Sequence, residues 1–217
     1  MNKKNIFIIL PFKESLNPKV AGAVSIYVRD SLTYSSYKKN IKIISSDNKN
    51  KKFFRNKNYI LDFCEKNKKK KIDIIEIHNR PEYVKYIKKY FQNTKIILTL
   101  HNDPLTLRGS EKINERENLL KDCSKIVFIS RWIQNRFFKS VVNSNYLNTE
   151  IIYHGVKKTI NPSKNKKKNI LFVGKLNEAK GYKIYVEAAK KFKKFDKSWN
   201  FIAIGDEPRK KIFPDKN

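Results

Sequence analysis

The sequence contains only two cysteines, Cys64 and Cys123, among its 217 residues. Two cysteines are too few for a disulfide scaffold, and no Cys/His group has zinc-site spacing, so we expect both to be reduced core residues. No apolar run reaches the roughly 18 residues of a membrane-spanning helix. The apolar stretch 5–10 ends at Pro11 and is shorter than the apolar region of a signal peptide. We therefore expect a cytoplasmic protein.

Arginine and acidic residues are scarce beside lysine. The chain has 8 arginines and 41 lysines, and its formal net charge is +29. Such a charge is typical of proteins that bind nucleic acid or anionic membranes, but A/T-rich codons also encode lysine, isoleucine, phenylalanine and the 24 asparagines. Because arginine is the better residue for bidentate phosphate recognition, nucleic acid is not expected as a partner. A weak peripheral contact with anionic lipid at the inner face of the cytoplasmic membrane fits the lysines better.

Short apolar runs alternate with longer amphipathic segments through the first 156 residues. Amphipathic segments predict helices at 22–37, 58–69, 81–91, 110–122 and 131–140. Apolar runs predict strands at 5–10, 41–45, 72–78, 95–100, 125–129 and 150–153. This order predicts an α/β fold, a doubly wound, Rossmann-like parallel sheet with helices on both faces. Ligands of such sheets bind beyond the carboxyl ends of the strands.

The alternation stops at residues 157–168, which are polar and basic and predict a linker. Beyond it, predicted strands at 169–173 and 199–204 flank a helix at 181–195. We therefore divide the chain into a domain at 1–156, a linker at 157–168 and the first part of a second Rossmann-like domain at 169–217. An independent doubly wound domain needs about 100 residues. We expect the second domain to be incomplete and to expose the apolar helix face that consists of Tyr182, Ile184, Tyr185 and Val186.

Candidate binding residues follow the predicted strands. Gly22 precedes a helix and would let backbone N–H groups approach a phosphate, although a tight turn alone also explains it. The residues after the third and fourth strands are His78, Asn79, Arg80, His101 and Asn102. Parallel strands place these two groups at one edge of the sheet, but each histidine is also explained as a structural cap. His154 fits a hinge better than a ligand, and without a DxD pair we expect no metal.

Residues 170–189, ILFVGKLNEAKGYKIYVEAA, contain two lysines near a strand end and a helix start. Lys175 and Lys180 would form an anion site by charge and helix dipole. In a chain so rich in lysine, two solvated surface side chains are the alternative.

This segment resembles the start of the second domain of family-4 glycosyltransferases, which reads strand, G-R/K-L, K-G and helix. Four further segments are similar, in order, to the first domain of bacterial members that build cell-surface polysaccharide: IIEIHNRPEY at 74–83, KIILTLHNDP at 95–104, KIVFISRWI at 125–133 and IIYHGV at 151–156. The resemblance implies the GT-B architecture of two Rossmann-like domains. It also implies retaining transfer of a sugar from a nucleotide-sugar donor to a cell-envelope glycan or lipid-linked acceptor, with no metal or other cofactor.

On this resemblance, Gly22, Lys175 and Lys180 would bind the donor diphosphate. His101 would be the catalytic-site residue that orients the reacting sugar. The candidates for cleft or acceptor contacts are His78, Asn79, Arg80 and Asn102.

The chain also departs from the family pattern. Ala23 stands where the family has a second glycine, Lys175 replaces an arginine, and His154 replaces an asparagine. The family's late pair of glutamates has no counterpart before Asn217. We therefore expect a truncated transferase, or alternatively a non-catalytic remnant or binding module for anionic membrane or polysaccharide.

Overall fold

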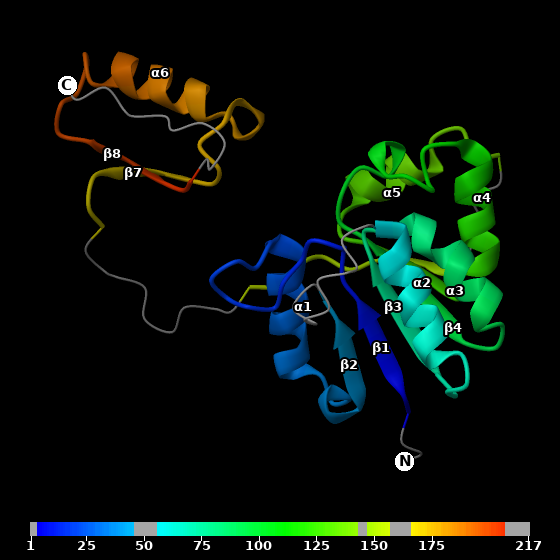
Figure 1. Cartoon of the computed structure of the whole chain (residues 1–217). Helices are drawn as coiled ribbons and strands as arrows, with labels where there is room; N and C mark the ends of the chain where they lie inside the picture. The colour runs from blue at the N-terminus through cyan, green and yellow to red at the C-terminus, as the bar shows by residue number, and fades with distance from the viewer. Residues whose placement is uncertain (1–3, 46–55, 143–146, 157–165, 207–217) are drawn as a thin grey trace. The chain divides into compact units, whose positions relative to one another are not determined.

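The computed structural model describes residues 4–45, 56–142, 147–156 and 166–206, and the chain divides into two compact units, Met1–Val156 and Lys157–Asn217. The larger unit contains a six-stranded sheet in the order β2-β1-β3-β4-β5-β6, with every neighbouring pair parallel (Figure 1). Its strands are β1 (Ile6–Ile9), β2 (Ile41–Ile44), β3 (Ile74–His78), β4 (Lys95–Leu100), β5 (Lys125–Phe128) and β6 (Thr149–Ile151). The predicted Rossmann-like parallel sheet is confirmed.

Five α-helices connect these strands in the described part of the larger unit. They are α1 (Ala23–Tyr34), α2 (Asn56–Asn67), α3 (Val84–Tyr90), α4 (Ile113–Asp122) and α5 (Arg131–Phe138). Two predicted helices begin later than expected. Pro81–Tyr83 form a 3-10 turn before α3. Residues 110–112 belong to a turn, because Gly109 has a φ of 88° and the Ser110 hydroxyl donates to the carbonyl of Pro104.

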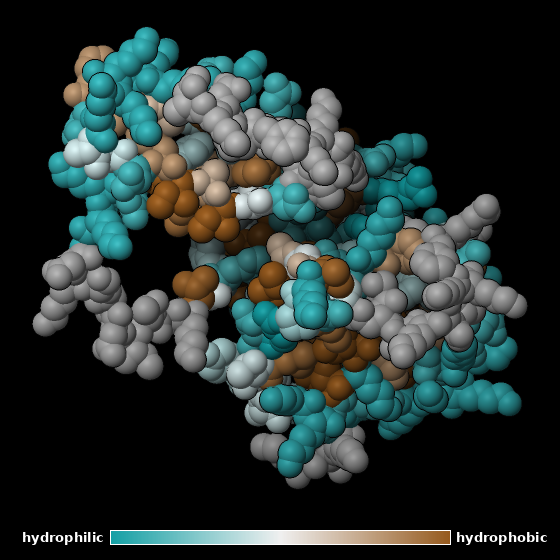
Figure 2. Space-filling model, turned by 60° about the vertical axis from the view of Figure 1, so that its left-hand side comes forward, coloured by the Kyte–Doolittle hydropathy of each residue, from teal (hydrophilic) through white to brown (hydrophobic). Residues whose placement is uncertain are grey.

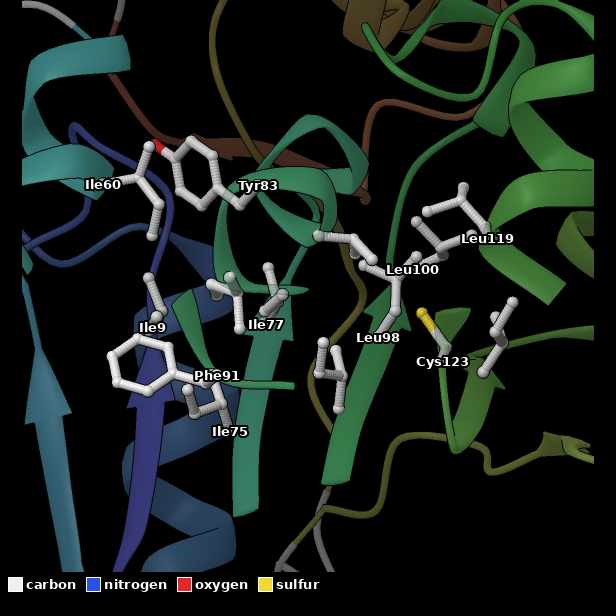
Figure 3. Packing of buried hydrophobic residues seen from close by; sticks show 14 of the residues in the cluster. Ile9, Ile60, Ile75, Ile77, Tyr83, Phe91, Leu98, Leu100, Leu119 and Cys123 are labelled. Atoms are coloured by element: carbon white, nitrogen blue, oxygen red, sulfur yellow. The ribbon is translucent and has the colours of Figure 1, made fainter. Parts of the chain in front are cut away.

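The main hydrophobic core lies between the sheet and helices α2 to α5 (Figure 3). Alternate residues of the strands point into it, including Ile75 and Ile77 of β3 and Leu98 and Leu100 of β4. The predicted core cysteines are also there as free thiols, and Cys64 and Cys123 are 0% and 4% exposed. Burial raises the pKa of the Cys64 thiol to about 12 and that of the Cys123 thiol still further.

The opposite face of the sheet packs on α1. Ile8 and Leu10 meet Val24 and Val28 of α1 in a small apolar cluster. Beyond that cluster, β3 and β4 carry polar side chains on this face. Chain order also reverses here, because β2 and β3 lie on opposite sides of β1. Such a switch point is where doubly wound sheets bind ligands at the carboxyl ends of their strands.

The smaller unit contains the parallel strands β7 (Asn169–Val173) and β8 (Asn200–Ile204) and the helix α6 (Tyr182–Phe192). Phe172 packs on Tyr182 and Tyr185, with ring centroids 5.4 Å and 5.3 Å apart. The expectation that Tyr182 is exposed was therefore wrong, because this ring covers β7 and is only 6% exposed. Ile184 is 72% exposed, as expected. Most of the predicted linker, residues 157–165, lies outside the described residues.

The exposed apolar surface of the smaller unit lies mainly on the sheet face turned away from α6. There Leu171 pairs with Ile202, and Val173 pairs with Ile204; all four side chains are at least 38% exposed. In Figure 2, apolar residues in brown interrupt a surface that is otherwise mostly hydrophilic. Within the described ranges, no helix combines the length and apolarity needed to cross a bilayer.

Candidate functional site

All three histidines of the chain meet on the α1 face of the larger sheet. His78 ends β3, His101 follows β4, and His154 follows β6. The His101 ring lies 5.2 Å, centroid to centroid, from both His78 and His154. Tyr27 of α1 contacts all three rings, at 5.9 Å from His78, 5.1 Å from His101 and 4.3 Å, stacked, from His154. We call Tyr27 and these three histidines the histidine cluster.

A chain of polar contacts runs from Glu76 through His78 to His101. Glu76 Oε1 lies 3.2 Å from His78 Nε2 and accepts a hydrogen bond of 3.0 Å from the Thr99 hydroxyl. On the other side of the ring, His78 Nδ1 lies 2.9 Å from His101 Nε2. His78 is only 1% exposed, and its buried Nε2 has no hydrogen-bond partner in this structure, so the approach of Glu76 Oε1 is a contact and not a hydrogen bond.

Burial and neighbouring charges shift the proton affinities at this site. Burial lowers the pKa of His101 to about 3, and charge on His78 and His154 acts in the same direction. Burial opposes ionisation of Glu76, but attraction to His78 and the Thr99 hydrogen bond outweigh it, so the pKa of Glu76 lies below its ordinary value. The site therefore holds a carboxylate and a neutral His101 at neutral pH.

Asn79 joins the loops that follow β3 and β4. Its backbone has a φ of 57°, in the left-handed region that asparagine tolerates better than most residues. Its side-chain Oδ1 accepts from the backbone N–H groups of His101 and Asn102, at 3.2 Å and 3.1 Å. Arg80 in turn donates from Nη1 to the Asn79 carbonyl at 2.8 Å. These contacts fix the start of the loop that carries His101.

The predicted contacts with an acceptor stay predictions for this group of residues. His78 and Asn79 are buried, and Asn102 is exposed. In this structure His78 and Asn79 bond to neighbouring protein groups rather than facing solvent.

The N-terminus of α1 already holds an anion. Gly22 is the N-cap residue and provides no side-chain cap. The carboxylate of Glu14 takes that place, because Glu14 Oε2 accepts from the Ser25 hydroxyl at 2.5 Å and from the Ser25 backbone N–H at 3.3 Å. A Cβ atom at Gly22 would overlap this carboxylate. A carboxylate of the chain itself thus lies at Gly22, and the approach of a phosphate to this residue stays a prediction.

The two predicted lysines lie in the smaller unit, at the carboxyl end of β7. Lys175 follows this strand, and Lys180 ends the 3-10 turn Glu178–Lys180 just before α6. The Asn177 side chain caps that turn by accepting from the Lys180 backbone N–H at 3.2 Å. Both lysine side chains are exposed. Gly22 and the residues of the β3 and β4 loops belong to the larger unit instead.

The sequence analysis missed three residues that build this site. Glu76 had a signal, because strand alternation places it on the same face as His78. Tyr27 lies in the helix predicted at 22–37, and its contact with three distant histidines has no local signal. Glu14 lies in a loop without any repeating pattern. Among the described residues, no group of three or more His, Cys, Asp or Glu could hold a metal ion.

Comparisons with known proteins find relatives that this chain matches over only part of their length. No protein-family model matches the chain. Spore coat protein SA of Bacillus subtilis (strain 168) is 28% identical over 141 residues, which cover 56% of this chain and 36% of that protein. The crystal structure of Anabaena HepE in complex with UDP-glucose superposes on 93% of this chain, with a TM-score of 0.55 and 14% identity. The N-terminal domain of Candida albicans trehalose-6-phosphate phosphatase superposes on 94%, with a TM-score of 0.54 and 16% identity.

The chain is shorter than each of these relatives. It spans 36% of the spore coat protein, 60% of the HepE chain and 64% of the Candida chain. Sequence identities of 14% and 16% to the solved structures support a shared fold and no more. The chain therefore has a GT-B-like α/β fold, with a six-stranded Rossmann-like sheet and a small second sheet.

Proposed function

We propose that this chain binds a nucleotide-sugar donor and acts in a retaining glycosyltransferase whose acceptor is a cell-envelope glycan or lipid-linked sugar. One observation carries the proposal: α1 brings an anion-holding N-terminus and Tyr27, packed on a neutral His101, to the carboxyl edge of one sheet. A helix N-terminus favours phosphate in the same way as carboxylate. HepE, which has a similar fold, is in complex with UDP-glucose, and this supports a donor of that class.

In the proposed reaction, the donor diphosphate replaces the Glu14 carboxylate at the start of α1. The Ser25 hydroxyl and backbone N–H, which now donate to Glu14, would donate to phosphate oxygens. In the smaller unit, the exposed Lys175 and Lys180 would attract anionic groups of a donor through their charge and the start of α6. A neutral His101 would orient the sugar through a hydrogen bond rather than through charge. The proposed reaction needs no metal or other cofactor.

We expect UDP-glucose to bind the full chain saturably and Lys180→Ala to weaken binding about tenfold, the effect of losing one charge-assisted contact. Isothermal titration calorimetry measures both affinities. Lys191→Ala is the control, because it removes an equally exposed charge from the last turn of α6 and should leave the affinity unchanged.

Absence of saturable binding for several nucleotide sugars would remove the support for a transferase. Binding to anionic vesicles that weakens with salt and ignores Lys180→Ala would support the alternative, a binding module for anionic surfaces.

Glu14→Gln should strengthen UDP-glucose binding about fivefold to tenfold. The glutamine keeps the shape of the side chain but removes a negative charge that competes for the same helix N-terminus, where such a charge is worth about 1 kcal/mol. Asp30→Asn is the matched control, because it removes an exposed charge from the same helix, two turns away. Equal or weaker binding by Glu14→Gln would show that the carboxylate and the donor occupy different places.

A further inference from the structure

Trp132 presents a large aromatic ring to solvent in the first turn of α5. The residue is 58% exposed, although tryptophan is highly buried on average. Helix α5 begins at Arg131, shortly after β5 ends at Phe128. The ring therefore lies near the carboxyl edge of the sheet, which is the edge where sheets of this kind bind ligands. Neither the proposed donor contacts nor the histidine cluster uses it.

Arg136 holds this ring in place from one side. The guanidinium carbon of Arg136 lies over the Trp132 ring, 5.6 Å from its centroid, within the range of a cation–π interaction. The guanidinium is itself fixed by the carboxylate of Asp103. Its Nε donates at 3.1 Å and 3.0 Å, and its Nη2 donates at 2.7 Å. A ring fixed in this way loses little conformational freedom when a ligand packs on its exposed side.

Asp103 connects the Trp132 ring to the candidate site. It follows His101 and Asn102 in the loop after β4, and its side chain also caps the turn Pro104–Thr106. The histidine cluster lies on the α1 face of the sheet, whereas α5 packs on the opposite face. A ligand that contacts both therefore extends across the edge of the sheet, and a single sugar is too short for this.

The neighbours of Trp132 favour a saccharide over a lipid surface. Arg131 and Asn135 are exposed and polar, and Asn135 shares a helix face with Trp132 because it is three residues further on. Insertion into a bilayer needs an apolar helix face, but Ile133 and Phe137 of α5 are buried in the protein. A pyranose has C–H groups on its faces and hydroxyls around its rim. An aromatic face beside amide and guanidinium groups matches both.

We propose that Trp132 is a stacking platform for a distal sugar of the acceptor, which is then a glycan of several sugars. The inference rests on the proposed function in one respect only, which is that the bound glycan is the acceptor. Binding of a saccharide to Trp132 does not depend on the donor.

Fluorescence titration of the full chain in a Trp199→Phe background tests the platform, because Trp132 is then its one tryptophan. The probes are cellopentaose and chitopentaose, whose β-linked pyranoses expose C–H groups on both faces. We expect at least one of them to change the Trp132 emission saturably at millimolar concentration. Uridine and phosphatidylglycerol vesicles are the competing probes. A response to either of these without a response to a pentasaccharide would overturn the proposal, and so would no response to any probe.

Saturation-transfer NMR of the pentasaccharide measures affinity without relying on fluorescence. Trp132→Leu keeps an apolar side chain but loses the flat ring, and it should weaken binding about tenfold, whereas Trp132→Phe should weaken it about threefold. Arg136→Lys keeps the charge but loses the two-nitrogen contact with Asp103, and it should also weaken binding about threefold.

Tyr34→Leu is the matched control, because it removes an aromatic ring that is 75% exposed on α1. It should leave the affinity for the pentasaccharide unchanged. An equal loss in Tyr34→Leu and Trp132→Leu would show unspecific adsorption to exposed rings and would overturn the proposal.

The platform and the proposed function can fail separately. Pentasaccharide binding that depends on Trp132, in a protein that does not bind UDP-glucose, would refute the transferase and leave the platform. UDP-glucose binding without any response of Trp132 to a pentasaccharide would refute only the platform.

Discussion

Arg116→Met should lower the free energy of unfolding of the larger unit by about 3 to 5 kcal/mol. The Arg116 side chain is 2% exposed. It links the loop before α4 to the residue that follows α5. Its Nη1 donates to the carbonyls of Ser110 and Glu111, at 3.0 Å and 2.8 Å, and its Nη2 donates to the carbonyl of Lys139 at 2.7 Å. Methionine has a similar volume but leaves these carbonyl oxygens without their donors.

Urea unfolding followed by Trp132 fluorescence measures this loss. A Trp199→Phe background removes the second tryptophan, so that the signal reports the larger unit alone. Arg131→Met is the control, because Arg131 is exposed at the start of α5 and should cost less than about 0.5 kcal/mol. A loss below about 1 kcal/mol for Arg116→Met would show that water satisfies the three carbonyls.

Arg116 illustrates what the sequence could not predict. In the sequence it is one charged residue in a polar helix, and nothing nearby indicates that three backbone carbonyls, one of them 23 residues away, accept from it. The sheet could be predicted because its strands are short apolar runs, and in β1 (Ile6–Ile9) every residue is buried. That signal is local, whereas the environment of Arg116 depends on how the loops before α4 and after α5 meet.

The candidate site likewise has features that the local sequence predicts and features that depend on distant contacts. The positions of His78 and His101 could be predicted, because parallel strands bring their carboxyl ends to one edge. The distance of 2.9 Å between His78 Nδ1 and His101 Nε2 depends on the left-handed backbone of Asn79 and on the two hydrogen bonds that Asn79 accepts from the next loop. His154 reaches the same place through the return of the chain after β6, and its stacking on Tyr27 joins residues 127 positions apart, which no local pattern encodes.

The larger unit should lose stability as the pH falls from 6.5 to 5, at up to about 1.4 kcal/mol per pH unit. The pKa of His101 is lowered from 6.5 to about 3 by burial, so the unfolded chain binds a proton in this range that the folded protein does not. By linkage, stability is fully present above pH 6.5 and decreases with acidification until the folded pKa is reached. Over this interval the loss should be about 2 kcal/mol.

His101→Gln should flatten this profile, because glutamine can still bond to His78 but does not titrate. Between pH 6.5 and 5, the change in the free energy of unfolding reports on histidine. The pKa values of Glu76 and Asp103 lie below their ordinary values, so the contributions of these carboxylates to stability disappear only at lower pH. Urea unfolding at pH 7.5, 6.5, 5.75 and 5.0 in the Trp199→Phe background gives both slopes. A residual slope in the variant belongs to His154, whose pKa burial also lowers. Equal slopes in the two proteins would mean that His101 accepts a proton as readily in the folded protein as in water, which is incompatible with a neutral imidazole held between Tyr27 and His78.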